Sequence, residues 1–116
     1  MITDSKDGTL MLSELTDDAR LTSNLLPQPV QGREAVKRVI DNVEALCLDQ
    51  VVAYQHHFDT REVIVTHAHL ISGEAVEITT VGLRDASGWI GAIALDHRPP
   101  VVAKKLAAQL TARLHL

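Results

Sequence analysis

Apolar and polar residues alternate in four consecutive segments between residues 50 and 97. The segments are QVVAYQHHF, REVIVTHAHLI, EAVEITTVGLR and WIGAIALDH, and each is rich in valine, isoleucine, threonine or aromatic residues. This composition and length are typical of β-strands. The breaks at residues 59–60, 72–73 and 85–88 are short and contain turn-forming residues. Short turns join antiparallel neighbours, so the sequence predicts a four-stranded antiparallel meander.

The lengths of the loops predict how these strands pair. We take residues 59–60 and 72–73 as two-residue loops and residues 85–88 as a four-residue loop, which makes the adjoining pairs Phe58–Arg61, Ile71–Glu74 and Arg84–Trp89. Side chains alternate between the two sides of a strand, so this register sorts them onto two faces. The first face is bulkier and holds Gln50, Val52, Tyr54, His56, Val63, Val65, His67, His69, Val76, Ile78, Thr80, Trp89, Ile93, Leu95 and His97. The second face has smaller side chains, and a single β-bulge would exchange the faces beyond it.

Two helices are predicted to flank the sheet. Between residues 32 and 46, apolar side chains recur at the helical period on one side, at Ala35, Val36, Val39, Ile40, Val43 and Leu46. Pro99 and Pro100 suit the first turn of a second helix, which runs to Leu114. Residues 19–24 show a weak strand pattern, and residues 9–15 are read as a short helical turn. Both sheet faces are too apolar to meet water, so we expect helices on the first face and a second subunit on the other.

Composition and charge narrow the class of protein. The chain has 116 residues, enough for one domain with its own core, and the domain is taken as residues 1–116. A net charge of −4 leaves no basic surface for nucleic acid or for an anionic membrane. No apolar run is long enough to span a bilayer, and the start MITDSKDGTL does not resemble a signal peptide. The single cysteine, Cys47, excludes an internal disulfide and favours a cytoplasmic location.

The order of these elements, with the segment TDDARLTSNLLPQPVQGREAVKRVI and the late turn Gly88-Trp89-Ile90, resembles the nuclear transport factor 2-like superfamily. Within it, residues 12–97 look most like the SnoaL-like branch of cyclases and small isomerases. The resemblance implies an α+β fold, in which a cone-shaped, curved antiparallel sheet (a cystatin-like roll) holds a helix in its concave face around a pocket. It also implies homodimers through the convex side of the sheet. The helix after Pro99 is extra, and we expect it to replace the long N-terminal helix with which the family usually closes the cone.

Histidines are the main candidates for chemistry on the first face. His67 and His69 form a His-x-His pair whose side chains point the same way, and His97 lies two strands away, about 10 Å at the usual strand spacing. Imidazole titrates near neutral pH and can act as a general acid or base. We predict His97, His69 and His67 as catalytic residues, with Asp96 as an alternative acid. The opposing interpretation is that these histidines only line a polar pocket or form hydrogen bonds within the core.

The predicted ligand pocket is mostly apolar, as is usual for small-molecule sites. Its lining residues would be Tyr54, His56, Trp89, Thr80, Ile93 and Leu95. Three imidazoles could bind zinc, but ligands two strands apart converge only if the sheet is strongly curved, so no metal and no cofactor are predicted. The catalytic sets of the best-known enzymes in the superfamily are missing. Ser23 stands near the position of the ketosteroid isomerase base, and Val63 stands where the epoxide hydrolases would need an acid.

These observations leave three classes of function open. The first is a small-molecule enzyme with cyclase or isomerase chemistry that uses the pocket histidines. The second is a non-catalytic pocket for a small apolar molecule, and the third is a dimeric interaction module. The sequence favours a dimeric protein with a small-molecule pocket of the SnoaL-like type. Acid–base chemistry stays open, and the fold does not decide among the classes because unrelated functions share it.

Overall fold

The computed structural model describes residues 12–114 and contains one sheet and two α-helices. In chain order the elements are η1 (Leu12–Glu14), β1 (Leu15–Ser23), β2 (Val30–Gln31), α1 (Arg33–Leu46), β3 (Cys47–Phe58), β4 (Arg61–Leu70), β5 (Ala75–Arg84), β6 (Ile90–Arg98) and α2 (Pro100–Leu114). The six strands are ordered β2-β1-β6-β5-β4-β3. Strands β3 to β6 form the predicted antiparallel meander, and β1 joins β6 in parallel. Of the helical turn expected at residues 9–15, residues 12–14 form η1, Leu15 already belongs to β1, and residues 9–11 lie outside the described residues.

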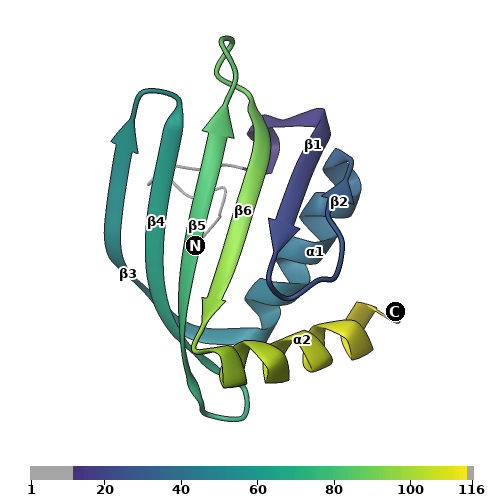
Figure 1. Cartoon of the computed structure of the whole chain (residues 1–116), viewed down its shortest axis with the longest axis vertical. Helices are drawn as coiled ribbons and strands as arrows, with labels where there is room; N and C mark the ends of the chain where they lie inside the picture. The colour runs from purple at the N-terminus through teal and green to yellow at the C-terminus, as the bar shows by residue number, and fades with distance from the viewer. Residues whose placement is uncertain (1–11, 115–116) are drawn as a thin grey trace.

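The sheet is curved and unclosed, and α1 lies against one of its faces (Figure 1). We call this face the inner face and the opposite one the outer face. The predicted apolar stripe of α1 is buried at Val36, Val39, Ile40, Val43 and Leu46, whereas Ala35 is exposed. The stripe joins the inner side chains of the strands in one hydrophobic core. The arrangement is the predicted α+β fold, with a helix in the concave side of the sheet and a second helix after it.

A glycine sets the direction in which α1 leaves the sheet. Gly32 has φ 105° and ψ 139°, a backbone conformation that residues with a side chain rarely adopt. Its N–H donates to the carbonyl of Ala19 on β1, and its own carbonyl accepts from the N–H of Val36 in the first helical turn. Arg33, the first residue of α1, pairs with Asp17 and donates to the carbonyl of Leu15. These contacts hold the start of α1 against β1.

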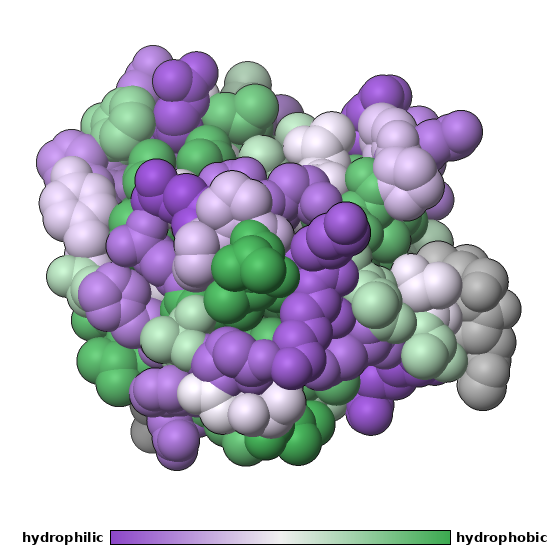
Figure 2. All heavy atoms as spheres, turned by 60° about the horizontal axis from the view of Figure 1, so that its bottom comes forward, coloured by the Kyte–Doolittle hydropathy of each residue, from purple (hydrophilic) through white to green (hydrophobic). Residues whose placement is uncertain are grey.

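Helix α2 packs against α1 and the ends of β5 and β6. It buries Val102, Ala103, Leu106, Leu110 and Leu114. Lys105 pairs with Glu74 in the β4–β5 loop, and Arg38 of α1 donates to the carbonyl of Leu114. Seen from the end of the molecule where α2 lies, hydrophobic patches are separated by hydrophilic side chains (Figure 2). The expectation that α2 closes a ligand pocket stays a prediction.

The loop between β4 and β5 corrects the predicted register. The N–H of Leu70 donates to the carbonyl of Glu74, and Gly73, at φ 101°, donates back to Leu70. The loop therefore has three residues, 71–73, and the predicted pair Ile71–Glu74 is wrong. Because side chains alternate, this shift of one residue moves every side chain of β4 to the opposite face. The other predicted hairpin pair, Phe58–Arg61, is confirmed.

Irregular pairing also changes the faces near other loops. Arg84 pairs with Ile90 and not with Trp89, and the register shifts again between Arg84 and Leu83. Ile90 is consequently buried on the inner face, while Trp89 is 46% exposed. Strand β3 has two register shifts against β4, between residues 48 and 51 and between residues 52 and 54. Among residues 12–114, neither helix is long and apolar enough to cross a lipid bilayer.

Candidate functional site

Three buried polar side chains lie on the inner face of the sheet among aliphatic neighbours. Thr66 on β4 pairs with Ile78 on β5, and Ile78 pairs with His97 on β6, so the two polar residues flank Ile78 in one row. Thr80 lies two residues further along β5. Usual strand spacing and rise place the Cα atoms of these three residues within about 10 Å of one another. Thr66, Thr80 and His97 are each 0% exposed, and we call them the inner polar cluster.

Each member of the inner polar cluster has one buried polar atom whose hydrogen-bonding capacity is unsatisfied. The Oγ1 atoms of Thr66 and Thr80 and the Nε2 atom of His97 are buried and have no hydrogen-bond partner among residues 12–114. A buried donor or acceptor that is left unpaired destabilises a fold by about 1–3 kcal/mol. Buried polar atoms are nearly always paired in native proteins, to protein groups or to ordered water, so three unpaired atoms on neighbouring inner positions mark a candidate site.

Asn24 fixes the imidazole of His97. The side-chain amide of Asn24 donates to the carbonyl of His97 over 2.8 Å, and its Oδ1 accepts from the N–H of His97 over 3.0 Å. The same Oδ1 lies 3.4 Å from Nδ1 of the ring. Because Oδ1 can only accept, the proton of a neutral imidazole is placed on Nδ1. Nε2 is then a bare acceptor that faces the interior.

Burial sets the charge of His97. Loss of water around the ring lowers the pKa of His97 from 6.5 to about 4. At pH 7 a group with this pKa is protonated in about one molecule in a thousand. The ring therefore has a hydrogen-bond acceptor to offer a ligand at neutral pH and almost no proton to donate from Nε2.

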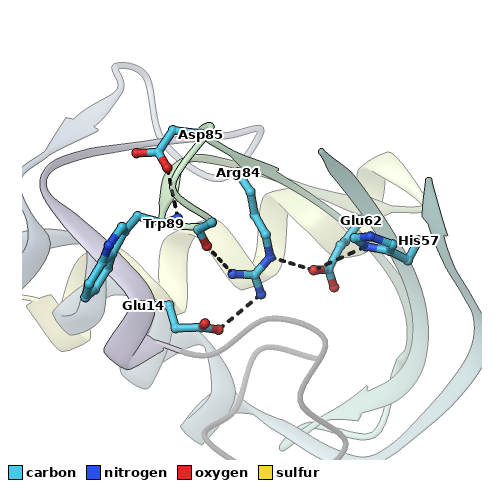
Figure 3. Close-up of polar contacts among 7 residues, drawn as sticks. Glu14, His57, Glu62, Arg84, Asp85 and Trp89 are labelled. Atoms are coloured by element: carbon cyan, nitrogen blue, oxygen red, sulfur yellow. Dashed lines mark hydrogen bonds and ion pairs between the residues drawn. The ribbon is translucent and has the colours of Figure 1, made fainter. Parts of the chain in front are cut away.

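A charged network lies at the other end of the same face, beside the β5–β6 loop (Figure 3). Nε of Arg84 donates to Oε1 of Glu62 over 2.7 Å, and Nη2 donates to Oε1 of Glu14 over 3.1 Å. Nη1 of Arg84 donates to the carbonyl of Gly88 over 2.7 Å. His57 approaches the same Oε1 of Glu62, with its Nδ1 at 3.5 Å. We call Glu14, Glu62 and Arg84 the rim network.

The rim network is partly buried and partly held by the loop. The side chain of Glu62 is 4% exposed, and that of Arg84 is 14% exposed. Asp85 shapes the loop, because its Oδ1 accepts from the backbone N–H groups of Ser87 and Trp89. Glu62 pairs across the sheet with Gly82, which adds no side chain to the inner face. The network therefore connects directly to the aliphatic inner surface.

The structure separates the predicted catalytic histidines. His97 lies on the inner face, whereas His67 and His69 point from the outer face and are exposed. The prediction that the three share a face is wrong, because the three-residue loop turns β4 over. Nε2 of His67 lies 3.4 Å from Oε1 of Glu77, which also pairs with Arg98.

The predicted pocket residues divide in the same way. Thr80, Ile93 and Leu95 are buried on the inner face beside His97, as predicted. Tyr54 and His56 are exposed on the outer face, where their rings stack at 6.4 Å between centroids. Their register partners Val65 and Val63 point the same way. Tyr54, His56 and the exposed Trp89 were predicted on the pocket side, and that placement is wrong.

Residues of both parts of the site escaped the sequence prediction: Thr66 and Asn24 at the inner polar cluster, and Glu14, Glu62 and Arg84 in the rim network. Thr66 and Glu62 would have been placed on the inner face by a three-residue loop, for which Gly73 was the available signal. Asn24 bonds to a residue 73 positions away, and no local pattern could reveal that contact. Asp96 was the alternative acid, and it is exposed on the outer face, paired with Thr79.

The outer face has grooves of its own. One has a volume of about 380 Å³ and is lined by His67, Ala68, His69, Ala75, Val76, Glu77, Arg98 and Pro99. A smaller one of about 140 Å³ lies between β1, β5 and β6 and is lined mainly by apolar side chains. Within residues 12–114, no three histidine, cysteine or acidic side chains come together as metal ligands. The thiol of Cys47 is buried, and burial raises its pKa to about 11.

Comparison with known proteins identifies the fold. No protein-family model and no curated protein matches the chain. Among solved structures, an uncharacterized bacterial protein with a cystatin-like fold from Silicibacter pomeroyi has a TM-score of 0.84 at 14% identity, over 90% of this chain and 73% of that one. A steroid delta-isomerase from Pseudomonas aeruginosa has a TM-score of 0.83 at 19% identity, over 90% and 77%.

Other structures of the same kind match less closely. An NTF2-like protein of unknown function from Burkholderia xenovorans has a TM-score of 0.65 at 10% identity, over 77% of this chain and 68% of that one. A protein of the SnoaL-like family from Agrobacterium tumefaciens also matches. Identities this low show the fold alone. The chain has the cystatin-like α+β fold of nuclear transport factor 2-like proteins, which confirms the resemblance at the level of the fold.

Proposed function

We propose that the protein binds a small apolar molecule on the inner face of its sheet and accepts a hydrogen bond from it at Nε2 of His97. The observation that carries this proposal is the unpaired, fully buried Nε2, held in place through Asn24. Aliphatic side chains of Ile64, Ile78 and Leu95 surround the inner polar cluster and suit an apolar ligand body. Small-molecule sites commonly combine such walls with a few fixed polar groups.

Isomerase chemistry is a second candidate, and a specific arrangement favours it. A bare imidazole nitrogen next to two unpaired hydroxyls could take a proton from a carbon acid while the hydroxyls of Thr66 and Thr80 donate to the developing oxyanion. One solved structure with the same fold is described as a steroid delta-isomerase. The low pKa of His97 makes it a weak base, so we place ligand binding first.

We also propose that the protein is a homodimer through the outer face. No helix of the described chain covers this face, and its exposed or half-buried apolar side chains include Val51, Tyr54, Phe58, Val63, Val65, Val81, Leu83 and Ala92. A continuous apolar surface of this kind usually meets a partner. The single cysteine of the sequence favours the reducing cytoplasm as the location.

Amide NMR of isotope-labelled protein, titrated with α,ω-octanediol, tests the binding proposal. This neutral probe combines an apolar body with hydroxyl donors. We expect the largest shifts at the inner residues of β4, β5 and β6 and an affinity that falls about tenfold in His97→Phe, because one buried hydrogen bond is lost. His67→Phe, the same change on the outer face, is the control and should leave the affinity unchanged. Shifts confined to the outer face, or equal affinities of all three proteins, would contradict the proposal.

Activity on a β,γ-unsaturated ketone, followed by the ultraviolet absorbance of its conjugated product, tests the isomerase candidate. The chemistry predicts a rate above background that His97→Phe removes and His67→Phe retains. A rate equal to background in the wild-type protein would leave binding as the function.

A further inference from the structure

We infer that the rim network recognises a positive charge, so that the ligand of the inner face is an apolar amine. This inference rests on the proposed binding of a ligand to the inner face and names its chemical class. It starts from the second carboxylate oxygen of Glu62. Oε1 of Glu62 accepts from Arg84, whereas Oε2 is buried and has no hydrogen-bond partner within the described part of the chain.

The position of Oε2 makes it available to a ligand on the inner face. Glu62 begins the inner row of β4, which continues through Ile64 and Thr66. In the close-up, Oε2 points away from the guanidinium of Arg84 (Figure 3). The residue paired with Glu62 on β5 is Gly82, which has no side chain. Arg84 thus holds the carboxylate through Oε1, and Oε2 is the atom that we propose for the ligand.

The charges around Oε2 favour a cation. Two carboxylates, those of Glu14 and Glu62, share the single guanidinium of Arg84, so the rim network has one negative charge in excess. The charge is held at a side chain that is 4% exposed, where water screens it weakly. An anionic ligand would be repelled, and a neutral hydroxyl would bond without relieving the excess charge. A protonated amine supplies both the donor and the charge.

The other unpaired atoms on the inner face are compatible with this ligand. Nε2 of His97 can only accept at neutral pH, and the hydroxyls of Thr66 and Thr80 can accept as well as donate. Glu62 and Thr66 are four residues apart on β4, which corresponds to about 13 Å along a strand. The structure therefore suits an elongated apolar amine whose nitrogen lies at the rim network and whose second donor reaches the inner polar cluster.

Three probes of the same length separate charge from shape. They are ω-amino-octanol, α,ω-octanediol and ω-hydroxyoctanoate, titrated into the whole protein at neutral pH and followed by amide NMR. We expect the amine to bind about tenfold or more tightly than the diol and the carboxylate to bind more weakly than both. In Glu62→Gln the preference for the amine over the diol should fall to about one.

Glu77→Gln is the control, because it removes a carboxylate that also pairs with an arginine, Arg98, but lies on the outer face. It should leave most of the preference for the amine intact. If the wild-type protein binds the amine and the diol equally, the inference is wrong, but the proposed binding site still stands. This comparison uses the wild-type protein alone and so does not depend on the folding of a variant. A preference that survives Glu62→Gln would also overturn the inference. If no probe shifts the amide signals of inner-face residues, both the inference and the proposed function are wrong.

Discussion

At the scale of single residues, the proposed binding site depends most on His97. Its ring is fully buried, and its Nε2 atom gains nothing from the protein in return. Thr66 and Thr80 have the same property on the neighbouring strands. Groups that exist for a ligand commonly reduce stability in this way. The unpaired atoms of these three residues are therefore the clearest difference between the proposed binding site and an ordinary hydrophobic core.

The first prediction concerns pH. The pKa of His97 is lowered from 6.5 to about 4 by folding, so its neutral form is favoured in the native state. The resulting stability is fully present above pH 6.5 and is lost as the pH falls toward about 4. Chemical denaturation should show a loss on the order of 2 kcal/mol across this range. The loss should be largely absent in His97→Phe.

The titration of Glu74 must not contribute to that measurement. The pKa of Glu74 is lowered to about 2 by hydrogen bonds from Lys105 and Ser72, and its contribution to stability is lost as the pH falls below 4.5. The comparison of His97→Phe with the wild-type protein is therefore made above that pH. An identical slope in both proteins would contradict the assigned state of His97.

The second prediction removes an unpaired hydroxyl. Thr80→Val keeps the shape of the side chain and eliminates a buried oxygen without a partner, so the free energy of unfolding should rise by about 1 kcal/mol. Thr79→Val changes the neighbouring residue, which is half-buried on the outer face, and should have a smaller effect. Urea denaturation measures both. A lower stability of Thr80→Val would show that the hydroxyl is satisfied within the protein.

At the scale of elements, the sequence predicted the helices and strands well and the faces poorly. The apolar stripe of α1 and the prolines at the start of α2 are local signals, and both helices occur where predicted. The face of β4 depends on whether its loop has two or three residues. The segment around Ile71, Ser72 and Gly73 allows both lengths, so composition alone could not decide. That one residue determined which histidines were assigned to the pocket.

The same limit applies to strand irregularities. The register shifts in β3 and at Leu83 and Arg84 depend on contacts between strands, which the sequence of one strand does not reveal. The register of β5 and β6 was also predicted wrongly, since Thr80 pairs with Leu95 and not with Ile93. An offset of two residues keeps the alternation, so His97, Thr80, Ile93 and Leu95 were still placed on the correct face. The candidate site was therefore predicted on two of its strands and missed on the third, where Thr66 and Glu62 lie.

The third prediction tests how α1 begins. A Cβ atom at Gly32 would meet no atom within 4 Å, so any effect of Gly32→Ala comes from its φ of 105°. We expect the free energy of unfolding to fall by about 1–3 kcal/mol, because that backbone conformation strains residues with a side chain. Gly91→Ala is the control, since a Cβ there also meets nothing within 4 Å and no left-handed backbone is required. Equal effects of the two variants would refute this role of Gly32.

At the scale of the whole molecule, the two faces of the sheet differ in what covers them. The inner face holds α1, the inner polar cluster and the rim network, and the outer face has apolar side chains that no helix of the described chain covers. Exposed His67 and His69 belong to this outer face, beside Glu77 and Arg98. We assign the inner face to the ligand and the outer face to the second subunit.

The fourth prediction concerns that subunit. Leu83 is 39% exposed on the outer face, so Leu83→Lys should leave the fold intact and place a charge in the proposed interface. Sedimentation should show a dimer for the wild-type protein and a monomer for the variant. Ile71→Lys, which changes an exposed residue in the β4–β5 loop, should remain dimeric. A monomeric wild-type protein at high micromolar concentration would refute the dimer.

The most direct test of the account is the state of the two ring nitrogens of His97, read by nitrogen NMR of the imidazole. We predict a proton on Nδ1 and a bare Nε2 from about pH 8 to about pH 5.5, with no titration near 6.5. Addition of ω-amino-octanol or α,ω-octanediol should shift the Nε2 signal while the Nδ1 proton stays in place. A proton on Nε2, titration near the ordinary pKa, or an Nε2 signal that ignores both probes would contradict the central claim that His97 is the ligand's acceptor.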